Sequence, residues 1–148
     1  MTTHPDCSPS GTEAHANQEL IRLFETDTLP DGVFHHRDHV QVAFAYLCEY
    51  PIFEALPRFA AALKRFAAAR GKTGLYNETI TCAHFFLIQE RMARSGSETW
   101  EDFARDNPDL LVWKDGALKQ YYREETLNSE LAKHVFVLPD RSLKEPPR

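Results

Sequence analysis

The stretch of sequence that decides the fold is residues 34–47, which read FHHRDHVQVAFAYL. The apolar residues of its second half recur at i, i+3, i+4 and i+7, and they are Val40, Ala43, Phe44 and Leu47. This spacing is typical of the buried face of an α-helix. We therefore expect a helix that ends near Glu49, because Pro51 disfavours helical backbone at the residue before it.

Three further segments have the apolar periodicity of long helices. We expect one at residues 17–26, one that holds Pro57 in its first turn and stops at Gly71, and one at residues 77–94. Residues 80–88 are apolar nearly all round, a pattern typical of a helix at the centre of a fold.

The rest of the chain indicates short helices and two tails. Short helices are expected around Trp100 and Phe103 and at residues 108–113, 115–122 and 125–133, and no repeat or alternating strand pattern occurs. The sequence therefore predicts an all-α fold, a bundle of four main helices with additional short C-terminal helices. We expect a single helical domain at residues 16–140, between a disordered N-terminal tail, 1–15, and a C-terminal tail, 141–148.

Composition narrows the functional classes. The chain has 148 residues, a length that argues for one domain. Its net charge of −5 argues against partners such as nucleic acid or an anionic membrane. Its densest basic region, residues 64–72, reads as the solvated face and end of a helix. Residues 1–15 resemble no signal peptide. The apolar runs are all shorter than the ~20 residues of a membrane helix. The three cysteines form no paired motif. We therefore expect a soluble, cytoplasmic protein.

A histidine cluster opens the helix described first. His36 and His39 are three positions apart, so both can lie on or beside the buried face and meet one metal ion. The alternative is two histidines that are simply packed and hydrogen-bonded in the core. A second question stays open, because Asp38 can cap the helix, which would put His36 in the preceding loop.

The start of the helix at residues 77–94 supplies possible partners for these histidines. Two histidines and one carboxylate are a common ligand set for non-haem iron and catalytic zinc, so we predict His36, His39 and Glu78 as metal ligands, with Glu78 also a catalytic base. The alternative role of Glu78 is to stabilise the start of its own helix. The residues predicted to contact a substrate are Asn77, Thr81, His84 and Tyr122.

Three blocks of the chain resemble a family of small, uncharacterised bacterial helical proteins. The shared motifs are Phe-x-His-x-x-His before a helix, Tyr-x-Glu-Thr-Ile-Thr, and a Tyr-Tyr pair followed by a segment that closes on Pro-Asp. The matching residues are Phe34, His36, His39, Ala43, Tyr46, Leu47, Tyr76, Glu78, Thr79, Ile80, Thr81, Tyr121, Tyr122, Leu127, Ser129, Ala132, Phe136, Pro139 and Asp140. A histidine is often found in that family where this chain has Asn77. The resemblance thus implies either a lost metal ligand or an Asn77 that acts as a weaker oxygen ligand.

Three functions are consistent with these patterns. The first is a metal-dependent enzyme that acts on a small molecule, with divalent iron or zinc held between two helices. The second is a non-catalytic binding module in which the histidines, Tyr121 and Tyr122 line a pocket or pack in the core. The third is a helical interaction protein that forms a homodimer through its Phe-rich surfaces.

Overall fold

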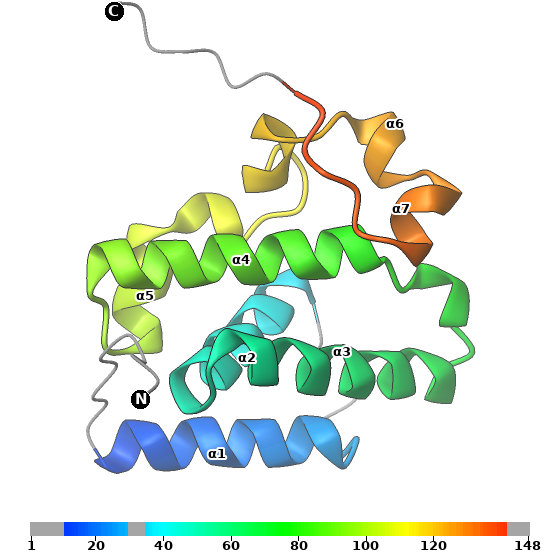
Figure 1. Cartoon of the computed structure of the whole chain (residues 1–148). Coiled ribbons are helices and arrows are strands. Elements are labelled where there is room, and N and C mark those ends of the chain that lie inside the picture. Colours follow the sequence, from blue (N-terminus) through cyan, green and yellow to red (C-terminus); the bar gives the residue numbers. More distant parts are fainter. Residues whose placement is uncertain (1–10, 30–34, 142–148) are drawn as a thin grey trace, which may run out of the picture.

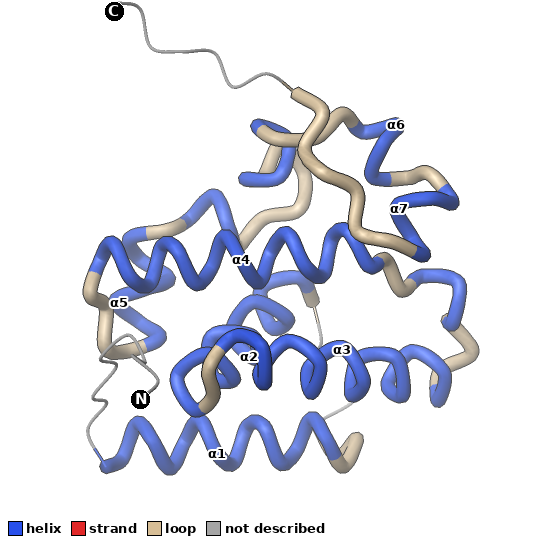
Figure 2. The backbone as a smooth tube through the Cα atoms, viewed as in Figure 1, coloured by secondary structure: helices blue, strands red, loops and turns tan. Residues whose placement is uncertain are grey.

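Helices and loops make up the whole described part of the chain (Figure 2). The computed structural model describes residues 11–29 and 35–141, and no strand occurs within these ranges. The predicted all-α fold is therefore confirmed. Most of both predicted tails, residues 1–10 and 142–148, lies outside the described residues. None of the described helices is long and apolar enough to cross a membrane.

The four main helices predicted from the sequence are all present. Their bounds are α1 Gly11–Glu25, α2 His36–Glu49, α3 Ile52–Ala69 and α4 Glu78–Ser95. Figure 1 shows α1 at one edge of the molecule and α4 on the far side of α2 and α3. This arrangement leaves α2 covered by α1, α3 and α4.

Short helical segments complete the fold. They are a 3₁₀ helix at Thr73–Leu75 before α4, then α5 (Trp100–Asp106), 3₁₀ helices at Pro108–Leu110 and Ala117–Gln120, α6 (Glu124–Leu127) and α7 (Glu130–His134). Those that follow α5 lie on the side of α4 that faces away from α1 (Figure 1). The predicted C-terminal series of short helices is thus present, although its members are shorter than expected.

The most buried helix is α2, where every residue from Val42 to Cys48 is buried. Residues 80–88 lie on α4, which is central as expected because it packs against α2 and α3 on one side and α7 on the other, but it is less completely buried than α2, since Phe86 is 40% exposed. Ala43 and Ala45 explain part of the difference, since small side chains let neighbouring helices approach α2 closely.

Proline and glycine set the limits of α3. Pro51 precedes the helix with φ −61°, so α3 begins at Ile52 and Pro57 falls in its second turn, not its first as predicted. The helix stops as expected at Gly71, whose φ of +66° is strained for any residue with a side chain. The backbone N–H of Lys72 then donates to the carbonyl of Ala67 at 2.8 Å.

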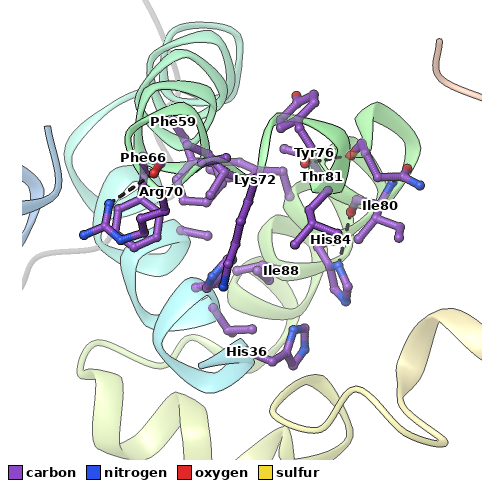
Figure 3. Close-up of a pocket in the computed structure, with 18 residues that line it drawn as sticks. His36, Phe59, Phe66, Arg70, Lys72, Tyr76, Ile80, Thr81, His84 and Ile88 are labelled. Atoms are coloured by element: carbon purple, nitrogen blue, oxygen red, sulfur yellow. Dashed lines mark hydrogen bonds between the residues drawn. The ribbon is translucent and has the colours of Figure 1, made fainter. Parts of the chain in front are cut away.

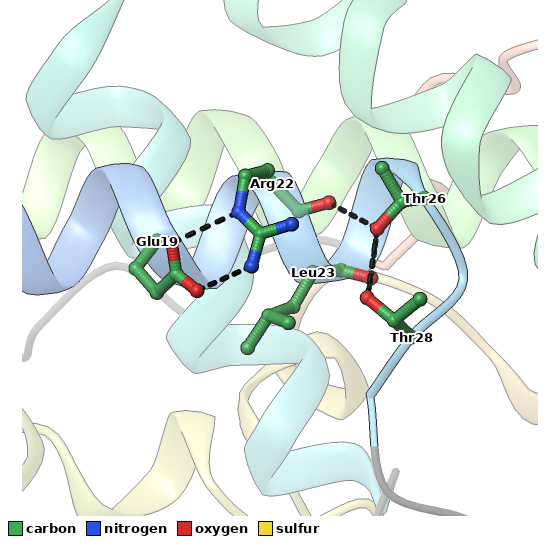
Figure 4. Close-up of polar contacts among 5 residues, drawn as sticks. All are labelled: Glu19, Arg22, Leu23, Thr26 and Thr28. Carbon is green, nitrogen blue, oxygen red and sulfur yellow. Dashed lines mark hydrogen bonds and ion pairs between the residues drawn. The ribbon is translucent and has the colours of Figure 1, made fainter.

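The first helix is longer than its sequence pattern indicates. It begins at Gly11, so residues 11–15, which were predicted as tail, are helical. At its other end the Thr26 hydroxyl donates to the Arg22 carbonyl at 2.8 Å and meets the Thr28 hydroxyl at 2.8 Å (Figure 4). The Arg22 carbonyl also accepts from the backbone N–H of Thr26 at 3.0 Å, so the hydroxyl adds a second hydrogen bond at the end of the helix.

The end of the described chain is held against residues 121–123. The backbone N–H groups of Asp140 and Arg141 both donate to the Tyr121 carbonyl, at 3.1 and 3.0 Å. The Asp140 carboxylate accepts from the Arg123 backbone N–H at 3.0 Å. Arg141, predicted to open the C-terminal tail, is therefore part of the folded domain.

Candidate ligand-binding site

A cavity of about 330 Å³ lies between α2, α3 and α4. Its apolar lining consists of Val40, Ala43, Phe59, Leu63, Phe66, Ala67, Leu75, Ile80, Phe85 and Ile88. Its other lining residues are His36, His39, Arg70, Lys72, Tyr76, Asn77, Thr81 and His84 (Figure 3). A mostly apolar cavity of this size with a few polar groups is typical of small-molecule binding sites.

Two of the histidines form a pair across the helices. The rings of His36 on α2 and His84 on α4 have centroids 5.1 Å apart. His36 Nε2 lies 2.9 Å from the carbonyl oxygen of Leu110, and His84 Nδ1 lies 3.1 Å from that of Ile80. The pair therefore joins α2, α4 and residues 107–116, the loop after α5 that includes the 3₁₀ helix Pro108–Leu110.

These contacts decide which ring nitrogens carry hydrogen. A carbonyl oxygen can only accept a hydrogen bond, so His36 donates through Nε2–H and His84 donates through Nδ1–H. In a neutral imidazole the other nitrogen is then an acceptor. The remaining lone pairs are on Nδ1 of His36 and Nε2 of His84.

Burial keeps the histidines of the cavity uncharged near neutral pH. Burial followed by the proximity of His36 lowers the pKa of His84 to about 3. Burial followed by the proximity of His36 lowers the pKa of His39 to about 4. The pKa of His36 is also lowered by burial, against the opposing effect of its bond to Leu110. All three rings are thus neutral hydrogen-bonding groups at pH 7.

The start of α2 settles the position of His36. The Asp38 carboxylate accepts from the backbone N–H of His35 at 2.8 Å, so Asp38 does stabilise the helix start. His36 is nevertheless the first residue of α2 and not part of the loop. The histidine pair therefore stands at the N-terminal end of the central helix.

The loop after α5 contributes to the site in a way that no sequence motif indicates. Trp113 lies against both rings, with centroid distances of 5.8 Å to His36 and 6.2 Å to His84. A side chain at Gly116 would place its Cβ 2.2 Å from the Val112 carbonyl oxygen, so only glycine fits this turn. A compact loop thus supplies both Trp113 and the carbonyl that orients His36.

Glu78 has a different partner from the one predicted. Its Oε1 accepts from the Tyr76 hydroxyl at 2.6 Å, which together with burial raises the pKa of Tyr76, and Glu78 does not line the cavity. Among the described residues, no three His, Cys, Asp or Glu side chains are placed to hold one metal ion. The predicted set of His36, His39 and Glu78 is therefore not assembled in this structure.

Asn77 and Thr81 line the cavity, but their polar atoms bind the protein itself. Asn77 Oδ1 accepts from the Ile80 backbone N–H at 2.9 Å, and its Nδ2 donates to the Leu127 carbonyl at 2.7 Å. The Thr81 hydroxyl donates to the Asn77 carbonyl at 2.8 Å. Asn77 is thus the N-cap of α4 and links it to α6, which leaves its amide oxygen engaged instead of open to a metal.

Tyr122, predicted to contact substrate, lies elsewhere. It is buried, and its hydroxyl donates to the Val137 carbonyl at 2.7 Å. It lines a separate cavity beside Phe86 and Phe136, away from the histidines. Its hydrogen bond holds the segment after α7 against the domain.

The sequence interpretation assigned residues 64–72 to the solvated face and end of a helix, and Lys72 is indeed exposed, but Arg70 and Lys72 also line the cavity. Arg70 lines the cavity, donates to the Phe66 carbonyl at 3.1 Å and pairs with Asp27 at 2.9 Å. Lys72 follows the end of α3, and its side chain reaches across the cavity toward α2 (Figure 3). The chain reversal at Gly71 places Lys72, which follows it, beside the cavity.

Comparisons of the chain with family models, with curated proteins and with solved structures find no match. A functional assignment therefore rests on the cavity and on the side chains that line it.

Proposed function

We propose that the protein binds a small, mainly apolar molecule in the cavity between α2, α3 and α4. The polar end of this molecule is a hydroxyl group that donates a hydrogen bond to the pair of His36 and His84. The proposal concerns binding and assigns no reaction.

The observation that carries this proposal is the fixed orientation of the two imidazoles. The carbonyls of Leu110 and Ile80 each take one ring N–H, which leaves two acceptor nitrogens on the pair. The lowered pKa values mean that neither acceptor is protonated at pH 7. Acceptors that line the cavity favour an occupant that donates to them, because an occupant that displaces water without donating would leave them unsatisfied at a cost of about 1–3 kcal/mol.

Lysine at the opposite wall favours a hydroxyl over a group that only donates. The Lys72 side chain spans the cavity, so its ammonium can donate to the oxygen of the same group (Figure 3). A hydroxyl both donates and accepts, and it therefore matches histidine on one side and lysine on the other.

The rest of the cavity favours an apolar body of limited size. Phe59, Phe66 and Phe85 supply aromatic walls, and about 330 Å³ of space accommodates a single substituted ring or a short chain. Burial of that body supplies most of the binding free energy, and the hydroxyl fixes its orientation.

The test compares two probes that differ only in the hydroxyl group, 4-propylphenol and propylbenzene. Titration calorimetry on chelator-treated protein should give about tenfold tighter binding of the phenol, a difference of roughly 1.4 kcal/mol, since a net hydrogen bond contributes about that much. His84→Ala and His36→Ala should remove the preference. His134→Ala changes an exposed histidine outside the cavity and should keep it.

Equal affinity of wild-type protein for both probes would contradict the role of the histidine pair. Binding of neither probe would contradict the proposal as a whole. Circular dichroism of each variant separates a lost contact from a lost fold.

A further inference from the structure

We infer that His36 and His84 also form a site for one divalent metal ion of the zinc class at the polar end of the cavity. The inference goes beyond the proposed binding of a small organic molecule, because it concerns a metal ion that binds to the histidine pair without that molecule. It also differs from the ligand set predicted from the sequence, since it uses His84 and does not use Glu78.

The spacing of the two rings fits a shared ion. Two imidazoles on one tetrahedral zinc ion, with Zn–N bonds of about 2.0–2.1 Å, have ring centroids roughly 5 Å apart. The centroids of His36 and His84 are 5.1 Å apart. The separation of the two rings therefore matches that of two imidazole ligands on one ion.

The hydrogen bonds of the two rings are those expected of metal ligands. Histidines that bind a metal through one nitrogen usually donate the other N–H to a carbonyl or carboxylate, which fixes the ring and raises its basicity. His36 donates in this way to Leu110 and His84 to Ile80. The nitrogens that remain, Nδ1 of His36 and Nε2 of His84, carry the lone pairs that a metal requires.

The side chains around the pair set the expected affinity. His39 lines the same cavity as a third imidazole. Because no set of three ligands is assembled among the described residues, we expect two protein ligands and micromolar affinity, with the other coordination positions open to solvent or to the hydroxyl of a bound molecule.

The experiment is a titration of zinc chloride into chelator-treated protein that was purified without a histidine tag. Calorimetry should show one ion bound per chain with micromolar affinity. His36→Ala and His84→Ala should each weaken this binding at least tenfold. The matched control is the double variant His15→Ala with His134→Ala, which removes two exposed histidines outside the cavity and should leave the affinity unchanged.

Trp113 gives a local readout of the same event. Its ring lies beside both histidines, so Ni²⁺ bound to the pair should quench its fluorescence. The quenching should saturate at one ion per chain and should be lost in Trp113→Phe, which keeps Trp100. His84→Gln, which is less disruptive to packing than alanine, should also lose it while its circular dichroism spectrum stays the same.

Three results would overturn the inference. They are no zinc binding by the wild type, binding that survives both His36→Ala and His84→Ala, and binding that depends on Glu78 but not on His84. The test of ligand binding uses chelated protein and this test uses protein without ligand, so the failure of one proposal is distinguishable from the failure of the other.

Discussion

The imidazole of His36 and that of His84 lie 5.1 Å apart, each fixed by a backbone carbonyl of a different segment. His84 bonds within its own helix, whereas His36 bonds to Leu110 in the loop after α5. Trp113 of the same loop covers both rings. The geometry of the site therefore depends on the packing of α2 against α4 and on the position of this loop.

The buried histidines should make the stability of the protein pH-dependent. The pKa of His84 is about 3 in the folded protein, against 6.5 ordinarily. As pH falls below about 6.5 the unfolded chain takes up a proton that the folded protein does not, so the free energy of unfolding decreases by up to about 1.4 kcal/mol per pH unit. His84→Gln should therefore lose roughly 2 kcal/mol less stability than the wild type between pH 7 and pH 5.

Urea unfolding at a series of pH values measures this difference. His134→Gln should behave as the wild type, because that histidine is 76% exposed. Parallel pH profiles of wild type and His84→Gln would show that His84 titrates normally in the folded protein.

The ion pair of Arg91 and Asp109 should support the loop of the site. Two bonds of 2.9 and 2.8 Å join the guanidinium to the carboxylate, and they lower the pKa of Asp109. Asp109→Asn should cost about 1–2 kcal/mol at pH 7 and also weaken ligand binding, because Leu110 follows Asp109 directly. Because the pKa of Asp109 is lower in the folded protein than in the unfolded chain, the ion pair stabilises the fold fully above about pH 4. The effect should shrink as pH falls below about 4 and be lost only as pH passes through the lowered pKa of the folded protein.

Denaturant unfolding of Asp109→Asn at pH 7 and pH 3 checks this prediction. The control is Glu90→Gln, which breaks an exposed i,i+4 pair with Arg94 and should cost at most about 0.5 kcal/mol. Equal small effects of both variants would place the Arg91–Asp109 pair among ordinary surface pairs.

Phe85 should be among the strongest contributors to stability on α4. It is 1% exposed, and its ring packs against that of Phe59 in a tilted arrangement with a centroid distance of 4.8 Å. Phe85→Ala should lower the free energy of unfolding by about 3–5 kcal/mol through lost burial and a new cavity. Phe53→Ala is the matched control, because Phe53 is 80% exposed and should change stability by less than about 1 kcal/mol.

Asn77 should stabilise the fold through both polar atoms of its side-chain amide. Asn77→Ala removes the N-cap of α4 and leaves the Leu127 carbonyl without its donor, which should cost about 2–3 kcal/mol. Asn77→Asp keeps the cap to Ile80 but places a carboxylate at the Leu127 carbonyl. The midpoint of thermal unfolding should therefore be lower for Asn77→Asp than for the wild type. Equal midpoints would show that the hydrogen bond to the Leu127 carbonyl contributes little to stability.

The sequence by itself determined the buried face of the central helix and the end of the helix that follows it. The apolar spacing from Val40 to Leu47 predicted the buried face of α2, and Gly71 predicted the end of α3. These features could be predicted because they depend on interactions within one or two helical turns and on the allowed backbone angles of single residues.

Only the tertiary structure decided which polar groups meet. Spacing along one helix predicted that His36 and His39 would share a metal ion, whereas the packing of α4 across α2 places His84 beside His36. The side chain of Glu78, predicted as the third ligand, instead accepts a hydrogen bond from Tyr76. Leu110 contributes its backbone carbonyl, a group that every residue carries, so the identity of this residue does not indicate its role. Contacts between distant segments depend on helix crossing and loop closure, and neither is encoded in the periodicity of a single element.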